Sequence, residues 1–374
     1  MTINNEHKKL NVPNLRFPEF QGEWEKCKLG DISEFSKDRL NSKGLSCDNY
    51  VATENMLQDY QGIVAASNIP SSTNVIKFSK GDVLLSNIRP YLKKVWYADR
   101  DGGCSADVLV FKALSACIPD FLHYVIANDR FINFAMSGAK GVKMPRGDKE
   151  QMKTYEIGLP SIEEQKKIAK LLSLLDERIT TQNKIIDKLQ SLIKGIAQHC
   201  IRGLINGWEY VRLGDICKIT TGKLDANAQV ENGQYPFFTC AERPFNIDCY
   251  AFDTEALLIS GNGANLGYIN YYKGKFNAYQ RTYVLDHFSV NIQYVKWALK
   301  VLLPQRIAIE KSSSNTPYIV LSTLADLKIP IPNNSKQNHI ADLMMSFERK
   351  LSTQLVLSDL YNKQKQYLLR QMFI

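Results

Sequence analysis

The sequence predicts an α+β protein built from two duplicated α/β blocks, separated by two long helices that form an antiparallel coiled coil. Three observations predict this fold: the length of 374 residues, a pair of motifs that occurs twice, and a heptad pattern of apolar residues after each block. A chain of this length exceeds one ordinary hydrophobic core, so we expect at least two domains.

Two motifs occur twice in the same order along the chain. Trp24-Glu-Lys-Cys-Lys-Leu-Gly-Asp-Ile32 returns as Trp208-Glu-Tyr-Val-Arg-Leu-Gly-Asp-Ile216. The stretch from Ile157 to Ala169 returns as the stretch from Ile329 to Ala341, which defines the offset between the two copies. The repeat therefore predicts two copies of one architecture, the first of which is longer between its motifs.

Each block combines predicted strands with predicted helices. Short apolar runs bounded by Gly, Asn or Asp predict strands at 82–88, 108–111, 256–260 and 282–285. Apolar residues at helical spacing predict helices at 119–135 and 291–303. A proline-containing loop, a short helix and a strand follow in each half, with the loops at 138–145 and 312–317.

The two long helices are predicted from residues spaced alternately by four and three positions. The first seam consists of Ile168, Leu172, Leu175, Ile179, Gln182, Ile186, Leu189, Ile193 and Ile196. A second and weaker seam lies at the offset that relates Ile157 to Ile329, and it contains Ile340, Met344, Phe347, Leu351, Gln354 and Leu368. We expect the helices to pair antiparallel and to hold the blocks apart at opposite ends. The alternative is that each helix covers only its own block.

These patterns divide the chain into four segments: a first block at 1–160, a helix at 161–202, a second block at 203–332 and a C-terminal helix at 333–374. The net charge of +9 permits a polyanionic partner. Each helical segment carries +3, whereas the first block carries +2 and the second +1. A nucleic-acid surface on a block must therefore be a local patch.

Composition argues against several classes of protein. The hydrophobic fraction of 44% is typical of globular proteins, and no apolar run approaches the roughly 18 residues that span a bilayer. The polar start has no features of a secretory signal, so we expect a cytoplasmic protein with no membrane partner. The eight cysteines and five histidines lack metal-ligand spacing, which predicts reduced core cysteines and no metal site.

The motifs resemble those of the specificity (S) subunits of type I restriction-modification systems. The resemblance rests on Val12-Pro-Asn-Leu-Arg-Phe-Pro-Glu-Phe20, on the repeated Trp24 and Trp208 motifs, and on Ser260-Gly-Asn-Gly-Ala-Asn-Leu-Gly267. It also rests on Pro-x-x-x-x-Gln-x-x-Ile at the start of both long helices, 160–168 and 332–340. The second copy departs from the first because Asn333-Asn-Ser-Lys336 lacks the acidic pair of Glu163 and Glu164.

This resemblance implies a subunit that reads double-stranded DNA and has no catalytic residue of its own. Each block would be a target recognition domain for one half of a bipartite site, and the helices would set the gap between the halves. Two methylation subunits, which bind S-adenosylmethionine and methylate adenine at N6, and two ATP-dependent restriction subunits would join it. S-adenosylmethionine, ATP and Mg would thus belong to partners. Half-site readers related by a twofold axis contact DNA about 34–36 Å apart.

Several polar residues are candidates for DNA contact. In the turn at 261–267, Asn262 and Asn265 could contact phosphate or adenine, or the turn is purely structural. A nucleotide site is disfavoured there because a predicted strand follows the glycines. The counterpart in the first half contains Arg89, Lys93 and Lys94, and a solvated hairpin rim would look the same.

A glycine-containing loop at 137–146 supplies three further cations, Lys140, Lys143 and Arg146. Lysines of this kind position DNA, whereas an arginine can read guanine O6 and N7 with two hydrogen bonds. The counterpart at 311–317 has the single cation Lys311, so the two halves should favour different DNA sequences. Arg281 is a further candidate.

Two other functions remain open on the sequence. A bivalent scaffold or decoy would bind partner proteins through the same helices without reading DNA. A DNA-modifying enzyme is disfavoured because the chain lacks an Asp/Asn-Pro-Pro-Tyr/Phe segment and a phosphate-binding Gly-x-x-x-x-Gly-Lys-Ser/Thr loop. Glu164-Gln-Lys166 matches a nuclease-like Glu-x-Lys, but these charges open a predicted helix, where they are common.

Overall fold

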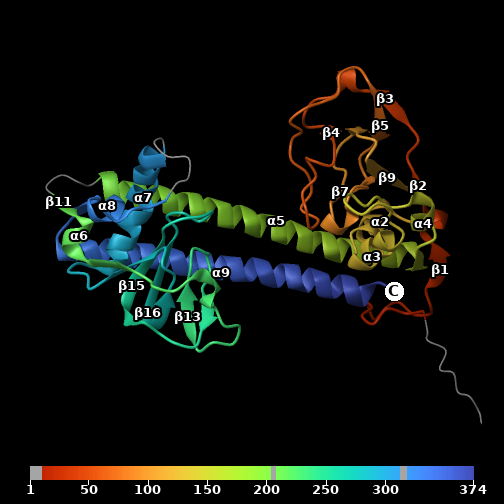
Figure 1. Cartoon of the computed structure of the whole chain (residues 1–374). Coiled ribbons are helices and arrows are strands. Elements are labelled where there is room, and N and C mark those ends of the chain that lie inside the picture. The colour runs from red at the N-terminus through yellow and green to blue at the C-terminus, as the bar shows by residue number, and fades with distance from the viewer. Residues whose placement is uncertain (1–10, 204–207, 312–317) are drawn as a thin grey trace, which may run out of the picture. The chain divides into compact units, whose positions relative to one another are not determined.

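The computed structural model describes residues 11–203, 208–311 and 318–374, with the side chains of residues 310 and 311 excluded. Two compact units divide the chain: unit 1 is Met1–Thr181 with Ser358–Ile374, and unit 2 is Gln182–Leu357. This division differs from the four predicted segments, because each unit includes part of both long helices, α5 (Ile162–Gln198) and α9 (Asn334–Met372) (Figure 1). No described helix has an apolar stretch long enough to cross a membrane.

Unit 1 contains two four-stranded sheets and a separate strand pair. The first sheet has the order β2 (Ser33–Phe35), β9 (Val108–Ala113), β6 (Val83–Ser86), β7 (Val95–Tyr97) and is antiparallel throughout. The second has the order β3 (Arg39–Asn41), β5 (Asn74–Phe78), β8 (Gly102–Cys104), β4 (Tyr50–Val51), with β4 and β8 parallel. Every residue of the central strand β6 is buried, which explains its unbroken run of apolar residues.

The strand pair of unit 1 closes the block onto its long helix. β1 (Glu25–Lys28) is antiparallel to β10 (Glu156–Leu159), with Glu25 opposite Leu159. Because β10 leads directly into α5, the repeated Trp-Glu motif at the start of the block is placed beside the start of the long helix. The two motifs that repeat in the sequence are thus neighbours in the structure.

Short helices cover the sheets of unit 1. They are α1 (Leu29–Ile32), η1 (Ser42–Gly44), η2 (Pro90–Leu92), α2 (Pro119–Ile126), α3 (Asp129–Ser137) and α4 (Lys149–Lys153). The single helix predicted at 119–135 is wrong, because the chain breaks between α2 and α3. Asn128 starts the new helix: its side chain accepts a hydrogen bond of 3.0 Å from the backbone N–H of Arg130, which is the geometry of a helix cap.

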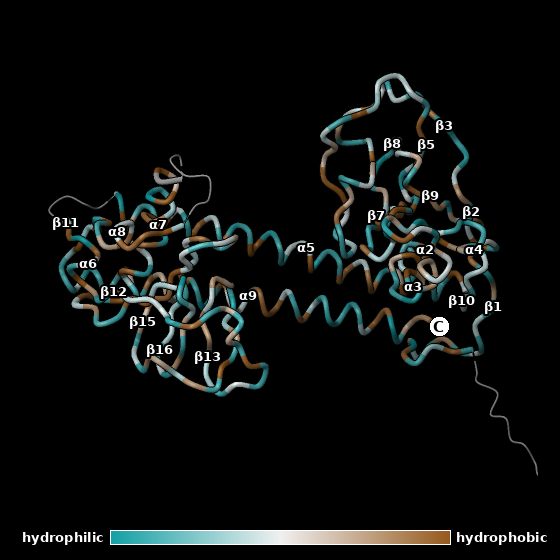
Figure 2. Tube along the Cα trace, viewed as in Figure 1, coloured by the Kyte–Doolittle hydropathy of each residue, from teal (hydrophilic) through white to brown (hydrophobic). Residues whose placement is uncertain are grey.

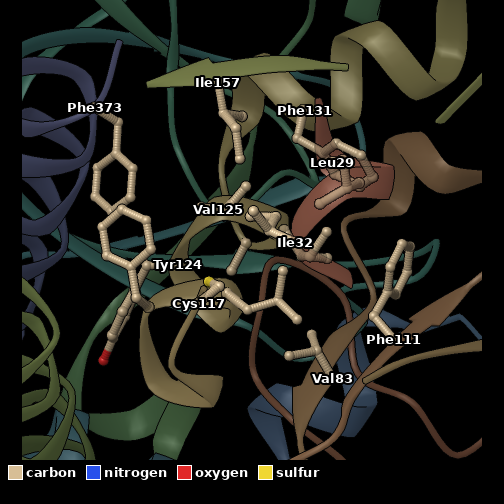
Figure 3. Close-up of a cluster of buried hydrophobic side chains, with 14 of the residues drawn as sticks. Leu29, Ile32, Val83, Phe111, Cys117, Tyr124, Val125, Phe131, Ile157 and Phe373 are labelled. Carbon is tan, nitrogen blue, oxygen red and sulfur yellow. The ribbon is translucent and has the colours of Figure 1, made fainter. Parts of the chain in front are cut away.

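The core of unit 1 joins sheet, short helices and both long helices. Figure 3 shows Val83 and Phe111 from the sheet together with Leu29, Val125 and Phe373. The Phe373 ring stacks on Phe121, with the ring centres 5.2 Å apart. Full burial of a phenylalanine contributes about 1.5–3 kcal/mol, so the C-terminal residues are part of this core.

Unit 2 has one six-stranded sheet and an equivalent strand pair. The sheet order is β12 (Lys218–Thr221), β17 (Thr282–Asp286), β15 (Phe252–Ser260), β16 (Ile269–Ala278), β13 (Tyr235–Phe238), β14 (Phe245–Ile247). Only β13 and β16 are parallel among these neighbours. β11 (Glu209–Arg212) is antiparallel to β18 (Lys328–Ile331), as β1 is to β10.

The helices of unit 2 repeat those of unit 1. They are η3 (His199–Gly203), α6 (Leu213–Ile216), η4 (Ala226–Ala228), α7 (Ile292–Lys311) and α8 (Leu321–Ala325). Helix α7 continues past the predicted end at residue 303, with Pro304 inside it. A proline lacks the N–H that an interior position donates and normally ends a helix, which is why the sequence predicted a shorter one.

Both units contain an antiparallel contact between α5 and α9 segments, and hydropathy alternates along both helices (Figure 2). In unit 1, Ile168 and Leu172 share a buried cluster with Leu369 and Met372. In unit 2, Leu189, Ile193, Ile340 and Met344 share another buried cluster. The buried seam positions are Ile168, Leu172, Leu175, Gln182, Ile186, Leu189, Ile193, Ile340 and Met344. The partly buried ones are Ile179, Ile196, Phe347, Leu351, Gln354 and Leu368.

The seam of α9 changes register near its C-terminal end. Leu369 is 2% exposed, whereas the predicted seam residue Leu368 is only partly buried. Lys365 takes a buried position and forms an ion pair of 2.5 Å with Asp176. A charged seam residue with a partner replaces the apolar one that the heptad would require, so the apolar contacts shift by one residue.

Candidate nucleic-acid interface

The Pro-x-x-x-x-Gln motif fixes each long helix to its block through one buried glutamine. In unit 1, Gln165 accepts a hydrogen bond from Ile118 N at 2.9 Å and donates to the carbonyls of Ala116 and Pro160, both at 3.0 Å. In unit 2, the equivalent Gln337 accepts from Asn291 N at 3.0 Å and donates to Pro332 O at 2.8 Å. Each glutamine ties the residue before α2 or α7 to the first turn of a long helix.

The acidic residue that precedes this glutamine has a structural role in unit 1. Glu164 is 1% exposed and accepts from Arg16 Nε at 2.7 Å and Nη2 at 2.8 Å, and from Trp24 Nε1 at 3.2 Å. Its oxygens are therefore occupied, and Lys166 pairs instead with Glu163 at 3.0 Å. In unit 2 the equivalent residue is Lys336, and the buried Trp208 Nε1 has no hydrogen-bond partner in the described residues.

A second set of buried polar contacts ties α2 and α7 to the long helices. In unit 1, Tyr124 donates to Asp176 at 2.9 Å. In unit 2, the equivalent pair is Lys296 and Glu348, whose Nζ and Oε2 lie 2.6 Å apart. Burial disfavours a charge on Glu348, but the hydrogen bond from Lys296 and the charge of Lys300 outweigh it, so its pKa is lowered. These contacts hold each block rigidly on its helices.

Two candidate segments of unit 1, far apart in the sequence, form one surface. Arg89 N donates to Pro145 O at 2.8 Å, and Ile88 forms a β-bridge with Arg146. Lys140 and Arg146 exchange two backbone hydrogen bonds of 2.9 Å, which closes the loop between them. The structure thus brings the 89–94 and 137–146 candidates together.

The cations of this surface differ in how free they are. Lys94 Nζ donates to Thr53 O at 2.6 Å, and Lys93 pairs with Asp129 at 2.8 Å. Lys140 pairs with Asp148 at 3.0 Å while its side chain stays 83% exposed. Lys143 is exposed and has no partner among the described residues. Lys94 is therefore a structural residue here, whereas Lys140 and Lys143 remain open to a ligand.

Arg89 holds the turn that carries these lysines. Its backbone is left-handed at φ 51°, as is that of Lys93 at φ 53°. For residues other than glycine this conformation costs on the order of 1–2 kcal/mol, so neighbouring contacts must maintain it. The hydrogen bond to Pro145 O does so at Arg89, whose buried Nε has no partner among the described residues.

In unit 2, the two candidate asparagines contact the protein. Asn262 Oδ1 accepts from Cys240 Sγ at 3.0 Å, and Asn265 Nδ2 donates to Cys240 O at 3.0 Å. These contacts favour the structural interpretation of the turn, with Gly267 left-handed at φ +82° and packed too closely against Ile307 for a side chain. Neither amide is free to read adenine with both of its groups.

Arg281 is the exposed cation of this surface, and it has no ion pair among the described residues. The side chain of Lys311 and the loop at 312–317 lie outside the described residues. Two residues near these surfaces were missed by sequence reasoning, Asp107 and Tyr318. The repeat offset that relates Ile157 to Ile329 also aligns Arg146 with Tyr318, and it could have found Tyr318.

Other kinds of site find little support in the described parts of the chain. No group of three His, Cys, Asp or Glu residues is placed to hold a metal ion in the ranges that the structure describes. One surface hollow of about 510 Å³ has a single carboxylate and is lined by Gln229, Val230, Glu231, Pro244, Phe245 and Asn246.

Comparison with known families decides what this architecture is. The family model of the type I restriction modification DNA specificity domain matches residues 21–191 and again residues 205–356. This chain belongs to that family. The double match confirms the predicted duplication and the predicted resemblance, and each specificity domain includes its β-strand pair and part of a long helix.

Relatives of these specificity domains come from distant organisms. The type I restriction enzyme EcoDI specificity subunit of Escherichia coli is 44% identical over 135 residues, which cover 36% of this chain and 30% of that protein. The MjaIX specificity subunit of Methanocaldococcus jannaschii is 24% identical over 254 residues, covering 58% of this chain and 59% of that protein. The matches thus span less than two thirds of these relatives.

Solved structures share the fold of the two specificity domains. The type I restriction-modification S subunit of M. genitalium superposes with a TM-score of 0.67 at 18% identity, covering 97% of this chain and 99% of that one. A chain of a type I R-M system, solved to explain complex assembly and conformational transition, has a TM-score of 0.57 at 21% identity and covers 92% and 96% of the two chains.

Proposed function

We propose that this chain is the DNA-specificity subunit of a type I restriction-modification complex and that it reads a bipartite target, one half with each specificity domain. The observation that carries the proposal is the double match to a DNA specificity domain. Two copies of one reading domain in one chain suit a target with two separate halves.

The candidate surfaces support different sequences for the two halves. Unit 1 presents Lys140, Lys143 and Arg146, while unit 2 presents Arg281 beside a turn built on Asn262 and Asn265. Lysines position the phosphate backbone, whereas arginines can discriminate bases in the major groove. Different exposed side chains on one fold would read different bases.

The long helices would carry two further tasks in this proposal. They would set the gap between the half-sites, and they would dock two methylation subunits, which two restriction subunits join. S-adenosylmethionine, ATP and Mg would be bound by those partners, and this chain would be non-catalytic. A relative named as a specificity subunit of a restriction enzyme supports this division of labour.

Salt dependence of DNA binding tests the reading function. We expect the affinity of the chain, assembled with a methylation subunit, to fall linearly on a log–log plot against salt, because phosphate contacts release counterions. Binding that is weak and insensitive to salt would favour a protein scaffold instead. The purified chain with labelled S-adenosylmethionine and DNA should transfer no methyl group, and transfer by the chain alone would contradict the non-catalytic role.

A further inference from the structure

Matching hydrogen bonds identify equivalent positions in the two units. Asn87 N donates to Asp107 O at 2.8 Å just beyond the β6–β9 ladder, which ends with Ser86 opposite Val108. Gly261 N donates to Arg281 O at 2.8 Å just beyond the β15–β17 ladder, which ends with Ser260 opposite Thr282. Asp107 in unit 1 and Arg281 in unit 2 therefore hold the same place in the fold.

A second hydrogen bond adds a third segment to each place. Gly147 N donates to Asn87 O at 3.3 Å, and Ile319 N donates to Gly261 O at 2.9 Å. The residue before each donor is Arg146 in unit 1 and Tyr318 in unit 2, which the repeat offset also aligns. We call the meeting of these three segments the junction of each unit: Asn87, Asp107 and Arg146 in unit 1, and Gly261, Arg281 and Tyr318 in unit 2.

The junction of unit 1 presents an oriented arginine. Arg146 Nη2 lies 3.0 Å from Asp107 Oδ1, and the two side chains are 58% and 39% exposed. An ion pair this exposed contributes little to stability. It does fix the direction of the guanidinium and leaves other N–H donors open to solvent. A guanidinium held in this way suits the two acceptors O6 and N7 on the major-groove edge of guanine.

The junction of unit 2 presents different chemistry at the same two positions. A cation, Arg281, stands where unit 1 has the carboxylate of Asp107. Tyr318, which is 55% exposed, stands where unit 1 has Arg146. The carboxylate that orients the arginine in unit 1 is therefore replaced, and an aromatic ring takes the place of the guanidinium.

We propose that the two junctions are equivalent base-reading positions and that Asp107 and Tyr318 determine specificity at them. Asp107 acts as a positioning residue that directs Arg146 toward a guanine of one half-site. Tyr318 replaces that arginine in unit 2, so the other half-site is read at this position by an aromatic ring beside Arg281. The inference rests on the proposed function and adds to it the residues that make the two halves differ.

The test is the methylated DNA motif of complexes assembled with a methylation subunit, measured by long-read sequencing for wild type and single variants. Arg146→Lys keeps the charge but loses the paired donors, and Asp107→Asn loses only the orienting charge. Both should relax the same guanine position of one half-site, with discrimination lowered roughly 5- to 150-fold for Arg146→Lys. Tyr318→Ala should relax one position of the other half-site.

Lys140→Gln is the matched control, because it breaks a neighbouring ion pair with Asp148 on the same loop. It should lower methylation evenly and leave the motif unchanged. The proposal is wrong if Arg146→Lys and Asp107→Asn give the wild-type motif, or if they lower methylation evenly as a lost phosphate contact would. A wild-type complex without any split motif would overturn the proposed function itself, which is a distinguishable result.

Discussion

Gln182 donates a hydrogen bond of 2.8 Å from Nε2 to Oε1 of Gln354, and a second of 3.1 Å to the Gln354 carbonyl. The offset of the repeat relates these two positions, so each glutamine is the copy of the other. Two copies of a helix that pair antiparallel bring a residue to its own copy only at the centre of the pair. A buried polar pair at that point fixes the register of the two helices.

Removing one glutamine should cost more than removing both. Gln182 is 5% exposed, so Gln354→Leu would leave a buried amide with fewer hydrogen bonds, at a cost of about 1–3 kcal/mol. The double variant Gln182→Leu with Gln354→Leu replaces both partners by apolar groups and should be near neutral. Unfolding in urea measures both, and a double variant as unstable as the single one would contradict this role.

Charges placed in the seam should abolish assembly. Leu175 is 9% exposed and Ile179 is partly buried, so replacing both by Asp brings two carboxylates without partners into the helix contact. We expect loss of folded helix pairing by circular dichroism and loss of complex formation. Leu174→Asp is the matched control, because Leu174 is 49% exposed on the same turn and should tolerate the charge. Normal assembly of the double variant would refute the seam.

Lengthening α5 should lengthen the gap between half-sites. Four residues inserted after Gln182 add about 6 Å of helix, so the gap should increase by about two base pairs. The same insertion after Lys43, in an exposed turn, should leave the gap unchanged. An unchanged gap in the helix variant would count against the helices as a ruler.

Acid should destabilise unit 1 through His123. Burial, and then the charge of Lys365, lower the pKa of His123 from 6.5 to about 4. Between pH 6.5 and 4 the unfolded chain therefore binds a proton that the folded chain does not, so stability falls as pH falls, by at most about 3 kcal/mol. His123→Phe preserves the stacking on Tyr97 and should reduce this loss. Equal pH dependence of unfolding in both proteins would contradict the assignment.

The sequence predicted the duplication and both long helices because these features repeat in local patterns. It missed the break between α2 and α3, where the Asn128 cap interrupts a continuous apolar pattern, and the passage of α7 through Pro304. Tertiary packing decides both places, and local propensity does not describe it.

The candidate site was only partly predictable for a similar reason. Arg89 and Arg146 share one surface because of a backbone hydrogen bond between distant segments, which no local pattern reports. The asparagines of the second turn looked free in the sequence, but the loop around Cys240 occupies them. Only the repeat offset pointed across the chain, and it aligned Arg146 with Tyr318.

Mapping N6-methyladenine across a genome tests the central claim most directly, with this chain co-expressed with a methylation subunit and the DNA read by long-read sequencing. The account predicts one split motif with a fixed gap, present only when this chain is present. A stable complex that methylates no motif, or a motif with a single uninterrupted half, would contradict it.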